Sequence, residues 1–140
     1  MRVVLDSNVL VAALRSSHGA SFALLSALPS PKFAPVLSVP LYFEYQDVLL
    51  RPGMVPASFT PADILAYCRF FVSVSHEQQI FFLWRTHLRD PKDDMILELA
   101  VAAQASYIIT HNLRDFAGAA KFGIVPIRPA AFLKLVGGLP

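Results

Sequence analysis

The fold of this chain is decided near its start, by residues 2–11, which read RVVLDSNVLV. Val3, Val4 and Leu5 form a short unbroken apolar run, which is typical of a strand buried on both faces of a parallel sheet. Asp6 comes where that strand should end, directly before an apolar segment of helical character. Ligands of open α/β sheets bind beyond the carboxyl ends of the strands. Asp6 therefore either belongs to such a site or only caps the first helix.

Segments of strand and helix character alternate along the rest of the chain. We expect further strands at residues 33–37, 107–110 and 124–127, and helices at residues 9–14, 21–28, 38–50, 60–72, 93–105 and 129–136. Pro35 suits only an edge strand or the start of a strand. Residues 80–84 could form a turn or a strand, and residues 117–121 one or two helical turns. The alternation predicts a single α/β domain over residues 1–140, with three α/β/α layers and a mostly parallel central sheet.

Composition limits the class of protein. The chain has 140 residues, 55% hydrophobic and 16% charged, and its mean hydropathy is +0.52. No run reaches the roughly 18 apolar residues that a membrane span needs, and the N-terminus lacks the order of a signal peptide. The single Cys68 excludes an internal disulfide and fits a reducing compartment. We expect a cytoplasmic protein without a membrane partner, whose excess apolar surface meets a partner or a second copy of the chain.

The acidic residues are scarce and unevenly placed. The net charge of +2 permits nucleic-acid binding without requiring it. Only Asp6, Glu44 and Asp47 precede residue 63, whereas four acids crowd residues 90–98. This distribution indicates a functional site, because acids that only solubilise a surface would be more numerous and more evenly spread.

Glu44 is the first acid that a helix brings toward the core. It lies three residues after Leu41 and four before Val48, so it borders the buried stripe of its helix. A carboxylate there is costly unless it is paired or bound to a cation. The alternative is a side chain that reaches solvent at the edge of the stripe.

Asp94 and Glu98 are spaced four residues apart, on one face of a helix that is apolar nearly all round. Like charges at this spacing repel each other, so a cation in front of them or between them would explain the pair. Asp90 and Asp93 are more simply explained by the helix dipole, which favours acids at an N-terminus. The same explanation applies to Asp94, although Asp94 is the innermost of the three and the better ligand candidate.

A third polar cluster follows the strand expected at residues 107–110 and reads THNLRDF at residues 110–116. Asn112 and Asp115 could be ordinary turn residues. With the three acids at positions 6, 44 and 94 they would instead complete a set of oxygen ligands without cysteine. Such sets select hard cations, Mg²⁺ or Mn²⁺, and these ions commonly serve phosphate chemistry.

Taken in order, these motifs resemble the PIN-domain ribonucleases, especially the VapC-like toxin components of bacterial toxin–antitoxin pairs. The matching pieces are VLDSNVL at residues 4–10, Glu44 in a helix, DPKDD at residues 90–94 before LELA at residues 97–100, and YIITHNLRDF at residues 107–116. The resemblance implies that Asp6, Glu44, Asp94 and Asp115 form a catalytic metal site.

The same resemblance assigns supporting roles to Asn8, Glu98, Thr110 and Asn112, with Thr110 orienting the ligands. Ser7 stands where the family usually has threonine, and Asn112 where many members have aspartate. Either Asn112 or Asp115 could therefore contact the metal.

The reaction implied by the resemblance is endonucleolytic hydrolysis of RNA by a metal-activated water, leaving a 5′-phosphate and a 3′-hydroxyl. It further implies an antitoxin protein as a partner and a homodimer. Arg89 and Arg114 flank the expected site and could hold the RNA backbone, although each taken singly is more simply a surface residue that pairs with the same acids. Two alternatives stay open: a non-catalytic RNA- or partner-binding module that retains the fold, and a structure-specific DNA nuclease.

Overall fold

A five-stranded sheet forms the centre of the computed structural model, which describes residues 1–80, 88 and 90–137. The strand order is β3-β2-β1-β4-β5, and every pairing is parallel. The strands are β1 (Arg2–Leu5), β2 (Ala34–Leu37), β3 (His76–Glu77), β4 (Tyr107–Ile109) and β5 (Val125–Ile127).

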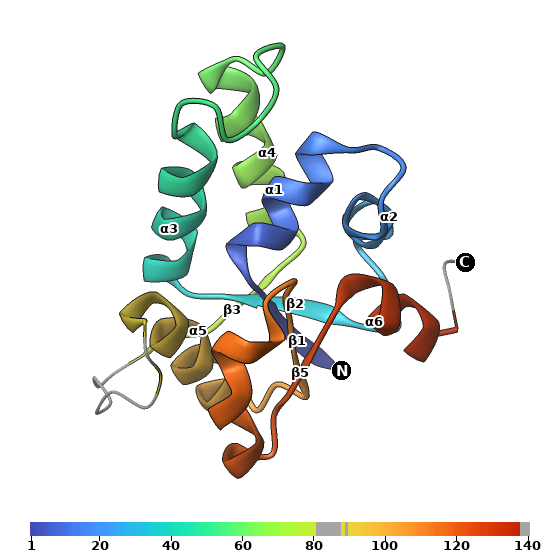
Figure 1. Cartoon of the computed structure of the whole chain (residues 1–140), viewed down its shortest axis with the longest axis vertical. Helices are drawn as coiled ribbons and strands as arrows, with labels where there is room; N and C mark the ends of the chain where they lie inside the picture. Colours follow the sequence, from blue (N-terminus) through green and yellow to red (C-terminus); the bar gives the residue numbers. More distant parts are fainter. Residues whose placement is uncertain (81–87, 89, 138–140) are drawn as a thin grey trace.

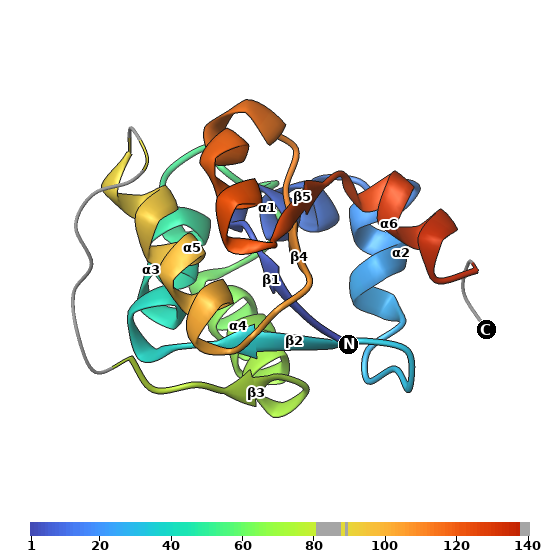
Figure 2. The ribbon, with the colours of Figure 1, turned by 90° about the horizontal axis from the view of Figure 1, so that it is seen from below.

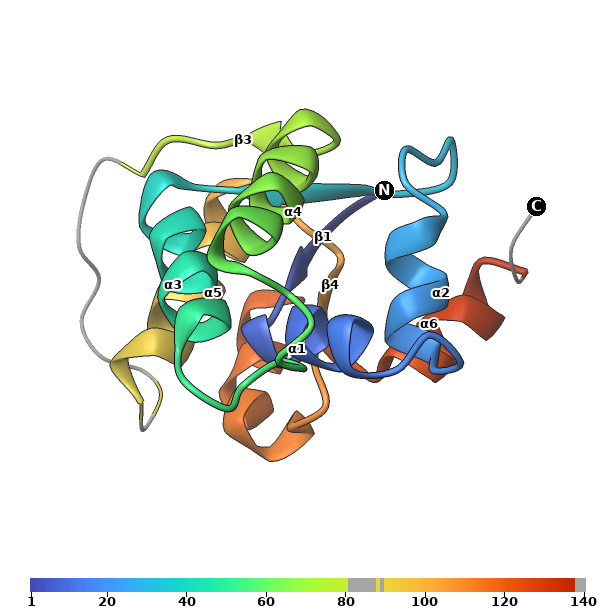
Figure 3. The same cartoon turned by 90° about the horizontal axis from the view of Figure 1, so that it is seen from above.

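Helices cover both faces of this sheet. They are α1 (Ser7–Arg15), α2 (Ala20–Ser26), α3 (Val39–Leu50), α4 (Pro61–Ser73), α5 (Pro91–Ala102), α6 (Pro129–Leu135) and the 3₁₀ segment η1 (Leu113–Phe122). In Figure 1, α1 to α4 lie above the strands, and α5 and η1 lie below them. Figures 2 and 3 show the same layers from below and from above, with α6 beside α2. The expected three-layer α/β/α fold with a parallel sheet is confirmed.

The centre of the core is the contact between β1 and α5. Val3, Val4 and Leu5 are fully buried, as expected of a strand with a neighbour on each side and helices on both faces. On one face α5 packs across β1, β2 and β4, and its Leu97 and Leu99 are also fully buried. The start of α5 is therefore held at a fixed distance from the end of β1.

Local sequence signals explain where α3 and α4 begin. The Ser38 hydroxyl accepts a hydrogen bond from the Leu41 backbone N–H at 3.2 Å and so caps α3. Thr60 and Asp63 form a reciprocal capping box at the start of α4. Both caps agree with the boundaries expected from the sequence.

Several boundaries differ from the expectation. The second strand is not at the edge, because the two-residue β3 pairs with Val36 and Leu37 on its far side. Pro35 is instead tolerated as the second residue of β2. The sequence has no strand pattern at β3, so this strand was not expected. Of the ambiguous segment at residues 80–84, residues 81–84 lie outside the described part of the chain.

The helix expected at residues 93–105 begins two residues earlier and ends at Ala102. Asp90 is its N-cap and Pro91 its first residue, a position where proline's missing N–H costs nothing. Gln104 adopts a left-handed conformation (φ 54°), so the helix cannot continue to residue 105. The helical turns expected at residues 117–121 belong to the longer η1, which is kinked at the buried Phe116.

Among the described residues, no single helix is long and apolar enough to cross a membrane. The pair α1 and α2 passes that test only in combination, and the two helices are bent by 100° from each other.

We expect Leu97→Ala to destabilise the protein by about 2–5 kcal/mol, because it removes a fully buried side chain from the helix that packs on the sheet. Leu135→Ala is the control, since Leu135 is half exposed on α6, and should cost less than about 1 kcal/mol. Urea unfolding of both variants measures the difference. Equal losses would contradict the position of α5 in the core.

Candidate functional site

Two neighbouring strands end side by side at the carboxyl edge of the sheet, and each is followed by a polar residue. Leu5 of β1 lies opposite Ile109 of β4, so the next residues along the two strands are Asp6 and Thr110. The Thr110 hydroxyl donates a hydrogen bond to Asp6 Oδ2 at 2.8 Å. Asp6 is 8% exposed and Thr110 is fully buried. A buried carboxylate is thus held at the position where α/β folds bind ligands.

Thr110 is the centre of a small polar network around Asp6. Its Oγ1 accepts hydrogen bonds from Asn8 Nδ2 at 3.4 Å and from the Asn112 backbone N–H at 3.0 Å. Asn8 Oδ1 accepts in turn from the His111 backbone N–H at 3.3 Å. The structure therefore brings Asn8, Thr110 and Asn112 together beside Asp6.

Asp6 occupies the N-cap position of α1, yet it makes no side-chain capping hydrogen bond there. The alternative in which Asp6 is simply a helix cap is therefore not realised. Its carboxylate is committed to Thr110 at the strand end instead.

The environment of Asp6 disfavours its charge. Burial raises the pKa of the Asp6 carboxyl above its usual value, hydrogen bonds from Thr110 and Ser7 offset part of this rise, and the charge of Asp115 adds to it. Behind the strand, the fully buried Tyr45 donates its hydroxyl hydrogen to the Leu5 carbonyl. Burial and the charge of Asp6 hold the pKa of Tyr45 well above its usual value, so Tyr45 remains a protonated donor.

Asp93, in the first turn of α5, is electrostatically coupled to Asp6. Burial raises the pKa of Asp93 to about 7, and the charges of Asp6 and Asp115 are the next largest causes. Asp90 and Asp94 add smaller contributions of the same sign. Since charges in a protein act strongly only over short distances, Asp6, Asp93 and Asp115 lie near enough to repel one another. We refer to these three residues as the acidic cluster.

The neighbouring acids of α5 have more local contacts. Asp94 Oδ1 accepts a hydrogen bond from the Leu88 backbone N–H at 2.9 Å, which fixes the chain just before the helix. Asp90 Oδ1 accepts from the Lys92 backbone N–H at 2.9 Å, as expected of an N-cap. Glu98 is half-buried one turn beyond Asp94.

Glu44 lies on α3 and faces the start of α5. Lys92 Nζ is 3.4 Å from Glu44 Oε1, and the side chains of Lys92 and Glu44 are 51% and 15% exposed. The carboxylate that borders the buried stripe of α3 is therefore paired with an ammonium group from another helix.

Of the two arginines expected to bind substrate, the structure describes only Arg114. Arg114 is exposed at the start of η1, next to the exposed Asp115. Arg89 lies outside the described residues. His111 Nε2 is within hydrogen-bond distance (3.0 Å) of Ser21 Oγ, which links the loop after β4 to α2.

The donors of the acidic cluster fit a hard divalent cation. The charge of Asp115 raises the pKa of Asp6, the charges of Asp6 and Asp115 raise the pKa of Asp93, and a cation would relieve this repulsion. The arrangement is not a closed ligand set. Within residues 1–80, 88 and 90–137, no three Asp, Glu, His or Cys side chains already stand as ligands of one ion. Asp6, Glu44, Asp94 and Asp115 are thus distributed around the carboxyl edge of the sheet, and the structure does not bring them to a single point.

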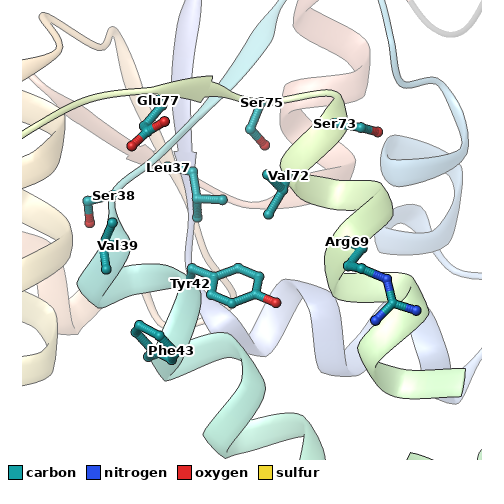
Figure 4. A pocket seen from close by; sticks show the side chains of 10 residues that line it. All are labelled: Leu37, Ser38, Val39, Tyr42, Phe43, Arg69, Val72, Ser73, Ser75 and Glu77. Carbon is teal, nitrogen blue, oxygen red and sulfur yellow. The ribbon is translucent and has the colours of Figure 1, made fainter. Parts of the chain in front are cut away.

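An apolar groove lies away from the acidic cluster. It has a volume of about 580 Å³ and lies between α3, α4 and β3. In Figure 4, Tyr42 and Phe43 from α3 lie on one side of it, Val72 and Arg69 from α4 on another, and Glu77 from β3 at its margin. None of the acidic cluster lines it, so the groove and the acidic cluster are separate features.

Comparison with known families gives one match. The family model described as PIN domain matches residues 2–114. The chain belongs to the PIN domain family. PIN domains are a nuclease fold, and their members are typically metal-dependent nucleases, which supports hydrolase activity on nucleic acids for this chain. The match includes Asp6, Glu44, Asp93 and Asp94 and stops one residue before Asp115. No curated protein matches the sequence significantly.

Two features of this PIN domain escaped the sequence analysis. Asp93 was assigned to the helix dipole, but the structure couples it to Asp6 and Asp115. The pairing of Lys92 with Glu44 joins positions 48 residues apart, for which no local signal exists.

Thr110→Val should destabilise the PIN domain by about 1–3 kcal/mol, because it removes a buried hydroxyl that serves Asp6, Asn8 and the Asn112 N–H. Thr110→Ser retains the hydroxyl and should recover most of the loss. Chemical unfolding at neutral pH measures both variants. Equal stability of the wild type and Thr110→Val would show that the network contributes nothing.

The stability of the metal-free protein should fall as pH rises from about 4 to about 7. The pKa of Asp93 is raised from 3.8 to about 7 in the fold, so the native state binds more protons than the unfolded state within this window. Asp93→Asn should flatten the decline and be more stable than the wild type at about pH 8. Thermal unfolding in a chelator at both ends of the window measures the effect, and parallel profiles would refute it.

Proposed function

We propose that this PIN domain is an Mg²⁺- or Mn²⁺-dependent endoribonuclease and the toxin of a toxin–antitoxin pair. The observation that carries the nuclease part is the acidic cluster. Three carboxylates, one directly after β1, one in the first turn of α5 and one in η1, are held within range of electrostatic repulsion at the carboxyl edge of the sheet. A protein gains nothing in stability from this repulsion, whereas a cation site needs such a concentration of negative charge.

The proposed cation ligands come from Asp6, Glu44, Asp93 or Asp94, and Asp115. When bound, a divalent cation supplies an activated water and neutralises charge on the departing oxygen. Thr110 orients the Asp6 carboxylate through its 2.8 Å hydrogen bond, and Asn8 and Asn112 hold Thr110. Tyr45 fixes the end of β1 from behind through the Leu5 carbonyl.

Of the two adjacent acids on α5, the electrostatics favour Asp93 as the ligand. Its charge is coupled to Asp6 and Asp115, whereas one oxygen of Asp94 is engaged by the Leu88 N–H. In this proposal Asp94 positions the segment before α5, and Glu98 supports it from one turn further along.

RNA is the proposed substrate. The phosphodiester reaches the acidic cluster only with the cation in place, because bare carboxylates repel phosphate. Arg114 at the start of η1, and Arg89 before α5, are the proposed contacts to the RNA backbone. The alternative substrate is DNA, and cleavage assays on RNA and DNA strands of matched sequence distinguish the two.

The antitoxin partner, the homodimer and the cytoplasmic location rest on the resemblance to VapC-like toxins. Exposed apolar side chains support the proposal of a protein partner: Val39 and Phe43 on α3 and Phe70 on α4 are each between 45% and 58% exposed. Exposed side chains of this kind are common at sites of association.

Purified protein should cleave a defined single-stranded RNA with Mn²⁺ or Mg²⁺, and a chelator should abolish the cleavage. Asp6→Asn and Asp93→Asn should each lower the rate by about 100-fold or more, and Asp94→Asn by less, because Asp94 acts through the backbone. Gel analysis of end-labelled RNA measures the rates, and circular dichroism verifies folding.

A matched DNA strand is the substrate control. Cleavage that survives the chelator, or that is unchanged in Asp6→Asn, would refute the proposed metal-dependent reaction. Preferential cleavage of the DNA strand would replace the ribonuclease by the DNA nuclease. A larger loss of cleavage rate in Asp94→Asn than in Asp93→Asn would indicate that Asp94, and not Asp93, is the cation ligand from α5.

A further inference from the structure

The ion pair between Glu44 and Lys92 is the only salt bridge between two different helices in the described part of the chain. It joins α3 to the second residue of α5, with Lys92 Nζ 3.4 Å from Glu44 Oε1. The other described salt bridge, Arg51 with Asp47, lies within a single turn.

The geometry makes this pair easy to open. The separation of 3.4 Å is longer than a good charge-assisted hydrogen bond, and half of the Lys92 side chain is exposed to solvent. Pairs of this kind contribute little to stability. By contrast, the Lys92 backbone is fixed, since its N–H donates to the Asp90 cap at 2.9 Å. The ammonium group can therefore swing while its point of attachment stays in place.

Lys92 stands beside an excess of negative charge. Asp90, Asp93 and Asp94 surround it in the sequence of the α5 N-terminus, and Glu44 faces it from α3. The helix N-terminus itself is a poor place for a cation, because its dipole end is positive. The position of Lys92 is thus favourable only because of these carboxylates.

We propose that Lys92 is an internal counter-ion of Glu44, which a divalent cation displaces, and that the released ammonium then binds a phosphate oxygen of the substrate. The inference rests on the proposed function, because it takes Glu44 as a cation ligand. In the metal-free protein Lys92 neutralises Glu44. With the cation bound, Glu44 turns to the metal and Lys92 is left at the rim of the site.

The decisive measurement is the affinity for Mn²⁺ alone, by calorimetry or by the rise of the melting temperature with Mn²⁺. Lys92→Met should bind Mn²⁺ about three- to tenfold more tightly than the wild type, since a competing unit charge has been removed nearby. Lys92→Arg should stay within about twofold of the wild type. Lys134→Met on α6 makes the same change in net charge far from α3 and should also have no effect.

A double-mutant cycle tests whether the effect runs through Glu44. In a Glu44→Gln background, Lys92→Met should produce less than half of its effect on Mn²⁺ affinity, because the carboxylate for which Lys92 and Mn²⁺ compete is no longer present. An equal gain in Mn²⁺ affinity in both backgrounds would mean that removing the Lys92 charge acts on the cation directly and not through Glu44, which would overturn the proposal. Unchanged or weaker Mn²⁺ binding by Lys92→Met would also overturn it.

The second step is tested with RNA at saturating Mn²⁺. Lys92→Met should raise KM about threefold or more and leave kcat within about twofold, because a phosphate contact is lost and the chemistry is not. An unchanged KM would overturn the phosphate role. A wild type that binds no Mn²⁺ would refute the metal site and this inference together. A wild type that binds Mn²⁺ but cleaves no RNA would refute only the proposed ribonuclease reaction.

Discussion

The hydrogen bond from Thr110 to Asp6 is the contact on which the rest of the carboxyl edge depends. A carboxylate that is 8% exposed would be expelled or protonated without compensation, and the donors near it come from the two strand ends. Thr110 can serve this role because β1 and β4 are paired in parallel and end in register. The position of Asp6 is thus a direct result of the sheet topology, and Asn8 and Asn112 reinforce it through the same hydroxyl.

Repulsion within the acidic cluster must be opposed by the packing of the elements that carry it. Asp6 follows the three fully buried residues of β1, and Asp93 lies in the first turn of a helix that packs on the sheet and whose Leu97 and Leu99 are fully buried. Removing apolar side chains from water stabilises by about 1.5–3 kcal/mol each. A few such residues outweigh the repulsion of partly solvated carboxylates, so the core holds the acids together. Functional sites commonly contain groups that repel each other and are held in place by a stable core.

The strands and the acids that follow them could be predicted because both signals are local. Three apolar residues before Asp6, and the apolar run before Thr110, are enough to place each polar residue at a strand end. The orientation of α5 could not be predicted in the same way. The helix is apolar nearly all round, so its sequence has no polar stripe that shows which of its acids lies nearest Asp6. The contact of Lys92 with Glu44 and the pairing of β3 with β2 depend on residues far apart in the sequence, and neither leaves a local pattern.

The pKa of Asp93 separates a structural from a functional explanation of the α5 acids. If the helix dipole were the reason for Asp93, the dipole would stabilise its charge and lower its pKa. The pKa is instead raised to about 7, with burial and the charges of Asp6 and Asp115 as the main causes. Asp90, which caps the helix through the Lys92 N–H, already fulfils the structural role at this terminus. Asp93 is therefore an acid that the helix does not need and whose charge is opposed by those of Asp6 and Asp115, as expected where a cation binds.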